Sequence, residues 1–238
     1  MKTLVMIPTY NEKENIVKLI KKILGLKING LEILVVDDNS PDGTSHKVQK
    51  IRNKNKKVHL LLRTEDKGRG KAGREGFLWC IKHKADYIIE MDADFSHDPK
   101  YIPHLLAKLK ECDMVLGSRF VKGGKQIKRP LRRCFITWAA NLYIRLLFRL
   151  KVKDCNSGYR AFRRKVLESI DLPHFTAKGP DIVQETLYRA HLKGFRICEV
   201  PIVFREREAG SSKLGMKQLW KGYTAVLRLK WMHLRGII

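Results

Sequence analysis

Long hydrophobic runs and closely spaced cysteine pairs are both missing from this sequence, and each absence argues against a class of protein. No stretch of about 18 apolar residues occurs, so we expect no membrane-spanning helix. The strand-like run TLVMIP follows directly after Met1 and Lys2, which predicts that no signal peptide is present. The five cysteines are scattered without C-x-x-C spacing, which favours a reducing compartment and argues against a disulfide framework or a zinc site.

Acidic residues are scarce relative to basic ones. The chain carries 49 Lys and Arg against 24 Asp and Glu, a net charge of +25 at pH 7. Such an excess predicts a polyanionic partner, namely nucleic acid, an anionic membrane surface or a phosphorylated substrate. Residues 119–165 hold 15 of the basic residues and a single acid, Asp154. That concentration favours a binding surface over a basic face that only meets solvent.

The first half of the chain alternates short apolar runs with segments of helical periodicity. The apolar runs are 3–7, 31–36, 58–62, 87–91 and 113–117, and the helical segments are 12–25, 43–54, 70–84 and 99–110. This alternation predicts an α/β fold in which a mainly parallel sheet carries helices on both faces. In the second half we expect helices at 131–150, 163–170, 181–193 and about 214–234, and a strand at 195–204.

Two of the expected helices in the second half are amphipathic. The helix at 131–150 has an apolar side through Phe135, Trp138, Leu142 and Leu146, and the last helix combines an apolar face with lysines and arginines. Such helices can lie in the headgroup region of a membrane. The alternative is that both apolar faces pack on the sheet.

Asp92 and Asp94 follow the strand expected at 87–91 and project to the same side of an extended chain. Two carboxylates so placed repel each other, and a hard divalent cation relieves this repulsion while substrate phosphates complete its coordination. A solvated strand end, with Asp98-Pro99 starting a helix, explains the short D-x-D motif equally well. The surrounding motifs therefore decide between these two interpretations.

Polar motifs follow four of the expected strands. They are PTYNE (8–12), DDNSPDGT (37–44), Asp92-Ala93-Asp94 and GSRF (117–120). Because ligands on open parallel sheets bind beyond the carboxyl ends of the strands, we expect these motifs to form one active site. Tyr10 offers a flat face for stacking, and Arg119 suits a bidentate contact with a diphosphate.

A glycine pattern suggests a different ligand. Gly68, Gly70 and Gly73 form G-x-G-x-x-G, with Asp92 at the distance expected of the acidic residue in a dinucleotide-binding fold. The pattern follows the third expected strand, however, and a dinucleotide site would leave PTYNE and D-A-D unused. We therefore favour a loop followed by a helix that packs closely on the sheet.

Further cations lie around the start of the helix expected at 131–150. Arg133 and Thr137 are four residues apart and so share a face near the helix N-terminus, where they fit a phosphate cradle. Arg207 and Lys213 supply two more cations on a Gly/Ser-rich loop, which we interpret as a lid. Taken singly, each of these residues is better explained as a partner in a surface ion pair.

Together these motifs resemble the family 2 glycosyltransferases with the GT-A fold, and within them the dolichol-phosphate mannose synthase group. The resemblance runs in chain order through PTYNE, VVDDNSPDGT, MDADFSHDP, GSRF, RRCFIT (132–137), NSGYRAF (156–162) and VPIVFREREAGSSKL (200–214). It implies that the nucleotide sugar is bound by Pro8, Tyr10, Glu12, Val36, Asp38, Asp92, Ala93, Asp94, Arg119 and Lys213. It implies a metal at Asp92, Asp94 and Ser96, an acceptor phosphate at Arg133, Thr137 and Arg207, and catalytic roles for Asp94, Arg119 and Arg133.

The resemblance also implies a reaction. We expect a single catalytic domain over 1–238, with a nucleotide-sugar and metal half at 1–120 and an acceptor half with the amphipathic helices at 121–238. The implied reaction is inverting transfer of mannose from GDP-mannose to polyprenyl or dolichyl phosphate, with Mg²⁺ or Mn²⁺ as cofactor. Transfer of glucose from UDP-glucose is the alternative, because no residue visibly distinguishes guanine from uracil.

The expected location follows from the lipid acceptor and the basic charge. We expect a cytoplasmic protein that associates peripherally with an anionic membrane surface, either directly or through a separate membrane subunit. A nucleic-acid-binding protein is a further alternative. No RNA-binding motif accompanies the basic run, so we expect no nucleic acid partner.

Overall fold

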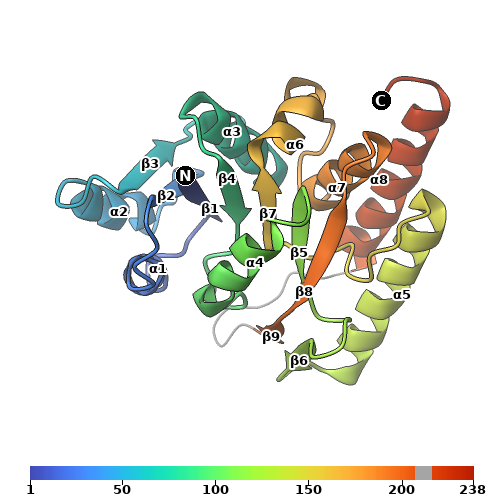
Figure 1. Cartoon of the computed structure of the whole chain (residues 1–238), viewed down its shortest axis with the longest axis horizontal. Coiled ribbons are helices and arrows are strands. Elements are labelled where there is room, and N and C mark those ends of the chain that lie inside the picture. Colours follow the sequence, from blue (N-terminus) through green and yellow to red (C-terminus); the bar gives the residue numbers. More distant parts are fainter. Residues whose placement is uncertain (207–215) are drawn as a thin grey trace.

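The computed structural model describes the backbone of residues 1–206 and 216–238, and the side chains of 1–206 and 222–238. Its central element is a seven-stranded sheet with strand order β3-β2-β1-β4-β7-β5-β8 (Figure 1). The strands are β1 (Thr3–Thr9), β2 (Leu31–Asp37), β3 (Val58–Leu62), β4 (Tyr87–Glu90), β5 (Met114–Ser118), β7 (Arg160–Arg163) and β8 (Ile197–Pro201). β7 runs antiparallel to both neighbours and the other pairs are parallel, which confirms the predicted fold class.

Helices cover both faces of this sheet (Figure 1). They are α1 (Ile16–Leu24), α2 (Thr44–Arg52), α3 (Arg69–Lys82), α4 (Ile102–Lys108), α5 (Leu131–Phe148), α6 (Arg164–Ser169), α7 (Ile182–Leu192) and α8 (Met216–Leu234), with short 3₁₀ turns at Pro99–Tyr101 and Leu172–His174. Every helix expected from the sequence is present, with bounds that differ by a few residues.

The strands divide their side chains between two cores because both faces of the sheet are covered. In β1, Leu4 and Met6 belong to the core on one face, and Val5 and Ile7 belong to the core on the other. All four side chains are fully buried. A strand buried on both faces is a continuous apolar run, which explains why the sequence predicts β1 clearly.

Two strands are not predicted by the sequence pattern. β7 is only four residues long, RAFR, and its strand conformation depends on pairing with β4 and β5 on either side. The three-residue β6 (Lys125–Ile127) pairs with β9 (Val203–Arg205) in a separate two-stranded sheet. The strand expected at 195–204 is therefore split at Ile202 into β8 and β9.

One pair of cysteines is bonded, so the expectation of unpaired cysteines is wrong for that pair. Cys112 and Cys198 form a disulfide, and their Cα atoms are 6.2 Å apart. Cys112 precedes β5 and Cys198 lies in β8, the strand that pairs with β5. The two cysteines are 86 residues apart in the chain. Only the pairing of β5 with β8 brings them together.

α5 and α8 lie side by side at one edge of the molecule (Figure 1), where the rings of Tyr143 and Tyr223 are 5.0 Å apart. Their outer faces carry exposed apolar side chains, which are Leu131, Phe135, Trp138, Leu142 and Leu146 on α5 and Leu227, Trp231 and Leu234 on α8. These side chains do not pack on the sheet. Among the described residues, no helix combines the length and the apolar composition needed to cross a bilayer.

Candidate active site

Asp92 and Asp94 lie on a tight turn directly beyond β4, at the carboxyl edge of the parallel strands. The backbone N–H of Ser96 donates to Oδ1 of Asp94 at 3.0 Å, and that of Asp92 donates to Nδ1 of His97 at 3.2 Å. Phe95 adopts the left-handed conformation, with φ of 61°, and so closes the turn. The turn's own hydrogen bonds therefore fix the Asp94 carboxylate and the backbone of Asp92 at the strand end, where the sequence predicts both residues.

His97 packs against this turn and accepts one of its hydrogen bonds. Burial lowers the pKa of its imidazole, so the ring is neutral near pH 7 and its Nδ1 can accept the hydrogen bond from Asp92. The ring stacks on Tyr159 with the centroids 5.0 Å apart. Gly158 passes close by, and a Cβ atom added there would lie 3.4 Å from Oδ2 of Asp92. The glycine thus leaves open the space beside this carboxylate.

A buried network of ion pairs lies next to Asp92. Glu90 and Arg160 are both fully buried and form an ion pair, and Nη2 of Arg69 lies 2.8 Å from Oε1 of Glu90. Burial works to raise the pKa of the Glu90 carboxyl, but Arg160 and Arg69 together bring it below its usual value. Nη2 of Arg69 also lies 3.5 Å from Oδ1 of Asp92. Arg69 therefore links the network to the candidate site, a role that the sequence analysis did not predict.

The predicted nucleotide side forms at the ends of β1 and β2. Pro8 and Val36 are neighbours in the sheet register, and both are buried. Tyr10 is 56% exposed, so its ring is available for stacking. Nδ2 of Asn15 donates to Oε2 of Glu12 at 2.9 Å, which holds this carboxylate near the start of α1. These predicted residues are therefore brought to one rim of the sheet.

The two aspartates at the end of β2 have different partners. Asp37 is fully buried and accepts hydrogen bonds from the hydroxyl of Thr9 at 2.8 Å and from the backbone N–H of Ser40 at 2.8 Å. Asp38 forms an ion pair with Arg63 and accepts from the backbone N–H of Gly68 at 2.8 Å. Asp37 thus holds the turn after β2, whereas Asp38 binds the segment that follows β3.

The glycine-rich pattern has a packing role, as the sequence analysis favoured. Gly68 precedes α3, and Gly70 and Gly73 lie within its first turns. A Cβ atom at Gly70 would come within 2.6 Å of the carbonyl oxygen of Ala177, and one at Gly76 within 2.3 Å of the sulfur of Met6. Only glycine lets α3 approach the sheet and the segment around residue 177 so closely.

Arg119 follows β5 and forms a bidentate ion pair with Asp154. Its Nε lies 2.8 Å from Oδ2 and its Nη2 lies 2.7 Å from Oδ1 of that residue. Burial works to lower the pKa of the Arg119 guanidinium, but Asp154 raises it above its usual value. Asp154, the single acid of the basic segment, is thus the counter-ion of Arg119. The predicted contact of Arg119 with the donor phosphates stays a prediction.

A second cluster of charges lies near the start of α5. Arg133 forms an ion pair with Glu206, and Nε of Arg129 lies 3.4 Å from Oε2 of the same carboxylate. Nη2 of Arg129 donates to the hydroxyl of Thr137 at 3.0 Å. Burial lowers the pKa of Arg129, and repulsion by Arg119 lowers it further. The structure therefore brings Arg133 and Thr137 together as predicted, and adds Arg129 and Glu206.

Phe204 joins this cluster to the rest of the site. The guanidinium carbons of Arg119 and Arg129 lie 5.2 and 5.5 Å from the centroid of the Phe204 ring. The ring of His97 approaches the same phenyl ring with the centroids 5.9 Å apart. The turn that carries Asp92 and Asp94 and the arginines around Phe204 are therefore neighbours.

Some residues of the candidate site are not predicted from the sequence, and two predicted residues fall outside the described side chains. Arg129 lies in the K-R-P sequence just before α5, and that short basic run is the only local signal for it. The predicted residues Arg207 and Lys213 lie outside the residues whose side chains are described. Their roles stay predictions.

Comparison with known proteins supports a transferase. The model of the family "Glycosyl transferase family 2" matches residues 4–171. The chain is 38% identical to an undecaprenyl-phosphate mannosyltransferase of Micrococcus luteus, over 96% of this chain and 100% of that protein. It is 40% identical to a polyprenol monophosphomannose synthase of Mycolicibacterium smegmatis, over 90% of this chain and 81% of that protein. It is 38% identical to a dolichol-phosphate mannosyltransferase of Pyrococcus furiosus, over 97% of this chain and 64% of that protein.

A solved structure confirms the fold. Glucosyl-3-phosphoglycerate synthase from Mycobacterium tuberculosis, in complex with Mn²⁺, UDP and phosphoglyceric acid, matches with a TM-score of 0.71. The match covers 96% of this chain and 78% of that one, at 20% sequence identity. At this level of identity the likeness bears on the fold alone, and it confirms the predicted GT-A architecture.

Proposed function

Because the chain belongs to glycosyl transferase family 2, we propose that it transfers mannose from GDP-mannose to the phosphate of a polyprenyl or dolichyl monophosphate. The observation that supports the proposal is the position of Phe204, whose ring lies against Arg119, Arg129 and His97, so that a cation suited to the donor phosphates and one suited to the acceptor phosphate both adjoin the turn bearing Asp92 and Asp94. The three mannosyltransferases named above, whose names specify polyprenyl or dolichyl phosphates, support the same substrate class.

We propose that Asp92 and Asp94 bind a divalent cation, either Mg²⁺ or Mn²⁺, and that Ser96 is a further ligand of this cation. Their carboxylates suit a hard cation, the Asp92 side chain is 32% exposed, and Gly158 leaves room beside it. In the described part of the chain, no three His, Cys, Asp or Glu side chains gather at a metal site. Substrate phosphates and water would therefore supply the remaining ligands. A bound cation would neutralise the departing diphosphate.

The residues of the chain then have separable roles in the transfer. Pro8, Tyr10, Val36 and Asp38 hold the nucleotide. Arg129, Arg133 and Thr137 orient the acceptor phosphate. A phosphate monoester is largely dianionic at neutral pH, since its second pKa is about 6, so this nucleophile needs positioning more than a general base.

The reaction itself is a single displacement. An acceptor phosphate oxygen forms the new bond to C1 of mannose while the bond from C1 to the β-phosphate of GDP breaks, which inverts C1. The Glu206 carboxylate forms ion pairs with Arg129 and Arg133, at the position where the acceptor phosphate would bind. Two anions at one site repel each other, so we expect Glu206 to move aside when the acceptor phosphate arrives.

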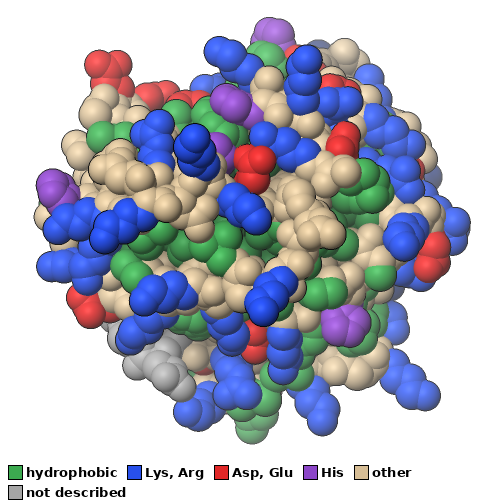
Figure 2. Space-filling view, turned by 60° about the vertical axis from the view of Figure 1, so that its left-hand side comes forward, with side chains coloured by type: hydrophobic (Ala, Val, Ile, Leu, Met, Phe, Trp, Pro, Cys, Tyr) green, Lys and Arg blue, Asp and Glu red, His purple; other side chains and the backbone are tan. Residues whose placement is uncertain are grey.

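We further propose that the protein attaches to the surface of a membrane without crossing it. The exposed apolar faces of α5 and α8 suit the headgroup region, where Trp138 and Trp231 would anchor the helices. On the face shown in Figure 2, which is turned away from the outer edge of α5 and α8, Lys and Arg side chains are more numerous than Asp and Glu. The basic charge of the chain as a whole favours an anionic leaflet.

The decisive experiment for the reaction measures which sugar enters the lipid. Purified protein in detergent is incubated with a polyprenyl phosphate, a divalent cation, and either labelled GDP-mannose or labelled UDP-glucose. We expect label in the lipid fraction from GDP-mannose only. Label from UDP-glucose alone would overturn the donor assignment, and label from neither would overturn the proposed reaction.

A further inference from the structure

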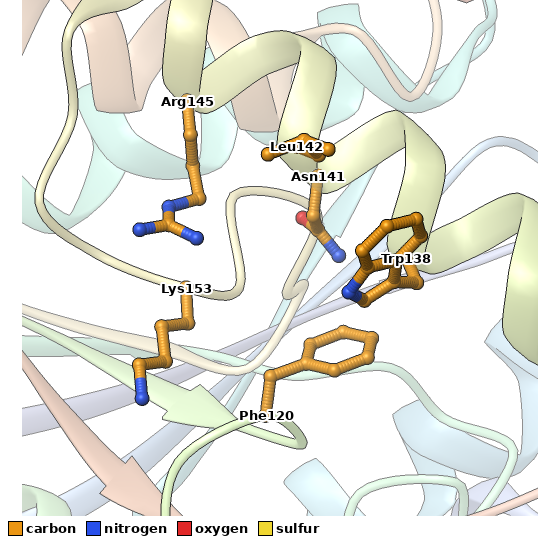
Figure 3. Close-up of a pocket in the computed structure, with 6 residues that line it drawn as sticks. All are labelled: Phe120, Trp138, Asn141, Leu142, Arg145 and Lys153. Atoms are coloured by element: carbon orange, nitrogen blue, oxygen red, sulfur yellow. The ribbon is translucent and has the colours of Figure 1, made fainter.

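A cavity of about 310 Å³ lies between α5 and the segments that follow β5 and precede β7. It is lined by Phe120, Trp138, Asn141, Leu142, Arg145 and Lys153 (Figure 3). The rings of Phe120 and Trp138 lie on one side, and the cationic side chains of Arg145 and Lys153 lie on the other. The cavity therefore combines an apolar side with a positively charged side, and the proposed reaction uses neither.

The two cations of this cavity have no anionic partner among the described residues. Nε of Arg145 is buried without a hydrogen-bond partner. The acids nearby are already engaged, since Asp154 pairs with Arg119. Glu199 accepts hydrogen bonds from the backbone N–H groups of residues 153 and 154 at 2.8 and 3.0 Å. Two positive charges without an ion-pair partner at one opening favour an anionic ligand.

The apolar side of the cavity continues onto the surface. Trp138 and Leu142 line the cavity and also belong to the exposed row on α5, in which Leu146 is 71% exposed. Residues at these spacings share one face of a helix. A ligand that fills the cavity and lies along this row must therefore have an anionic head and a hydrocarbon body.

We propose that this cavity binds the headgroup phosphate of an anionic membrane phospholipid. Arg145 and Lys153 would hold the phosphate, and the rings of Phe120 and Trp138 would contact the first carbons beyond it. The acyl chains would lie along Leu142 and Leu146. This inference depends on the proposed membrane attachment, but it does not depend on which sugar the enzyme transfers.

The charges distinguish this lipid from the acceptor. Arg145 follows Arg133 by 12 residues of the same helix, a distance of about 18 Å along its axis, so one phosphate cannot reach both. The acceptor carries one phosphate, which the proposed reaction places at Arg133. Its hydrocarbon chain has no second charge for Arg145 and Lys153, whereas a phospholipid supplies one.

The test uses soluble short-chain lipids and the full-length protein. Binding of dihexanoyl-phosphatidylglycerol and of dihexanoyl-phosphatidylcholine is measured by calorimetry for the wild type and for the double variant Arg145→Gln/Lys153→Gln. The matched control is Lys54→Gln/Lys56→Gln, which removes two exposed lysines between α2 and β3. A basic residue near an anionic headgroup contributes about fivefold in affinity, so the cavity variant should lose about thirtyfold for phosphatidylglycerol. The control should keep wild-type affinity.

A second readout locates the lipid in the wild-type protein. Phosphatidylglycerol brominated near the headgroup should quench tryptophan fluorescence, and Trp138→Phe should remove most of that quenching. Equal losses in the cavity variant and the control would overturn the proposal, because the binding would then be general surface attraction. Displacement of phosphatidylglycerol by farnesyl phosphate would also overturn it and assign the cavity to the acceptor. Mannosyl transfer in detergent is measured separately, so failure here leaves the proposed reaction standing.

Discussion

At the scale of single residues, the candidate site depends on how each charged group is held. Asp94 accepts a hydrogen bond within its own turn, while Asp92 lies near both Arg69 and His97. The fixed positive charge of Arg69 partly compensates Asp92 before any cation binds. Both carboxylates are therefore held at the strand end, where the proposed cation would meet the departing diphosphate.

We predict that Asp94→Asn severely reduces transfer and leaves the fold intact. Loss of a metal carboxylate removes several kcal/mol of transition-state stabilisation, so the rate should fall about 10³-fold. The control is Asp98→Asn, because Asp98 caps the following 3₁₀ turn and asparagine keeps that role. Full activity of the wild type in excess chelator, or near-normal turnover by Asp94→Asn, would contradict the metal assignment.

We predict that Arg133→Ala and Glu206→Gln change acceptor use in opposite directions. Removing Arg133 deletes a charged hydrogen-bond donor worth about 2 kcal/mol, so the KM for the lipid phosphate should rise about thirtyfold. Removing the Glu206 charge frees the arginines and should lower that KM. Initial rates at varied lipid and fixed GDP-mannose measure both effects.

Arg132→Ala is the matched control for this pair, because Arg132 is an exposed neighbour on the same helix. Its KM should stay close to the wild-type value. If Arg133→Ala weakens the donor as much as the acceptor, the two phosphates have been assigned to the wrong residues.

At the scale of elements, the order of the strands explains how distant segments meet. β7 lies between β4 and β5 in the sheet. Arg160 of β7 therefore pairs with Glu90 of β4, next to the turn that carries Asp92. β8 forms the edge of the sheet, and the Cys112–Cys198 disulfide ties it to the segment before β5. β9 follows β8 and carries Phe204 to the candidate site. The disulfide thus fastens the edge strand that leads directly into that site.

We predict that reduction of this disulfide lowers the free energy of unfolding by about 4 kcal/mol, because the bond closes a loop of 86 residues in the unfolded chain. Denaturant unfolding with and without reductant measures the loss. The double variant Cys112→Ala/Cys198→Ala should be less stable than the oxidised wild type and should not respond to reductant. A wild type whose stability is indifferent to reductant would show that the bond does not form in solution.

At the scale of the whole molecule, charge and apolar surface act together. The net charge of +25 attracts anionic surfaces over a Debye length, whereas the exposed rows on α5 and α8 act only on contact. Attachment through both should be reversible and sensitive to salt.

We predict that the protein sediments with liposomes of phosphatidylglycerol and phosphatidylcholine at low salt and is largely released at 1 M salt, where the Debye length is about 3 Å. Trp138→Ser/Trp231→Ser should weaken sedimentation at low salt, because both side chains are exposed on the outer helices. Liposomes of phosphatidylcholine alone serve as the control. No sedimentation at low salt would exclude direct attachment and favour a separate membrane subunit.

Features that depend on local pattern can be predicted from the amino-acid sequence alone. The buried strands of the first half, the helices and the polar motifs at strand ends follow from periodicity and turn chemistry, which act over a few residues. That is why the sequence alone predicts Asp92, Asp94, Tyr10 and Asp38 at one rim of the sheet. The short β7 escaped this reasoning, because four residues carry too little pattern to distinguish a strand.

Which charged side chains pair with each other depends on the tertiary fold. Arg119 pairs with Asp154 across 35 residues, and Arg133 pairs with Glu206 across 73. The Cys112–Cys198 bond and the cavity beside Trp138 likewise join segments that are distant in the chain. Contacts of this kind depend on the order of strands in the sheet and on the packing of α5 against its neighbours. Neither leaves a periodic trace in the sequence, because each is set by the path of the whole chain rather than by neighbouring residues.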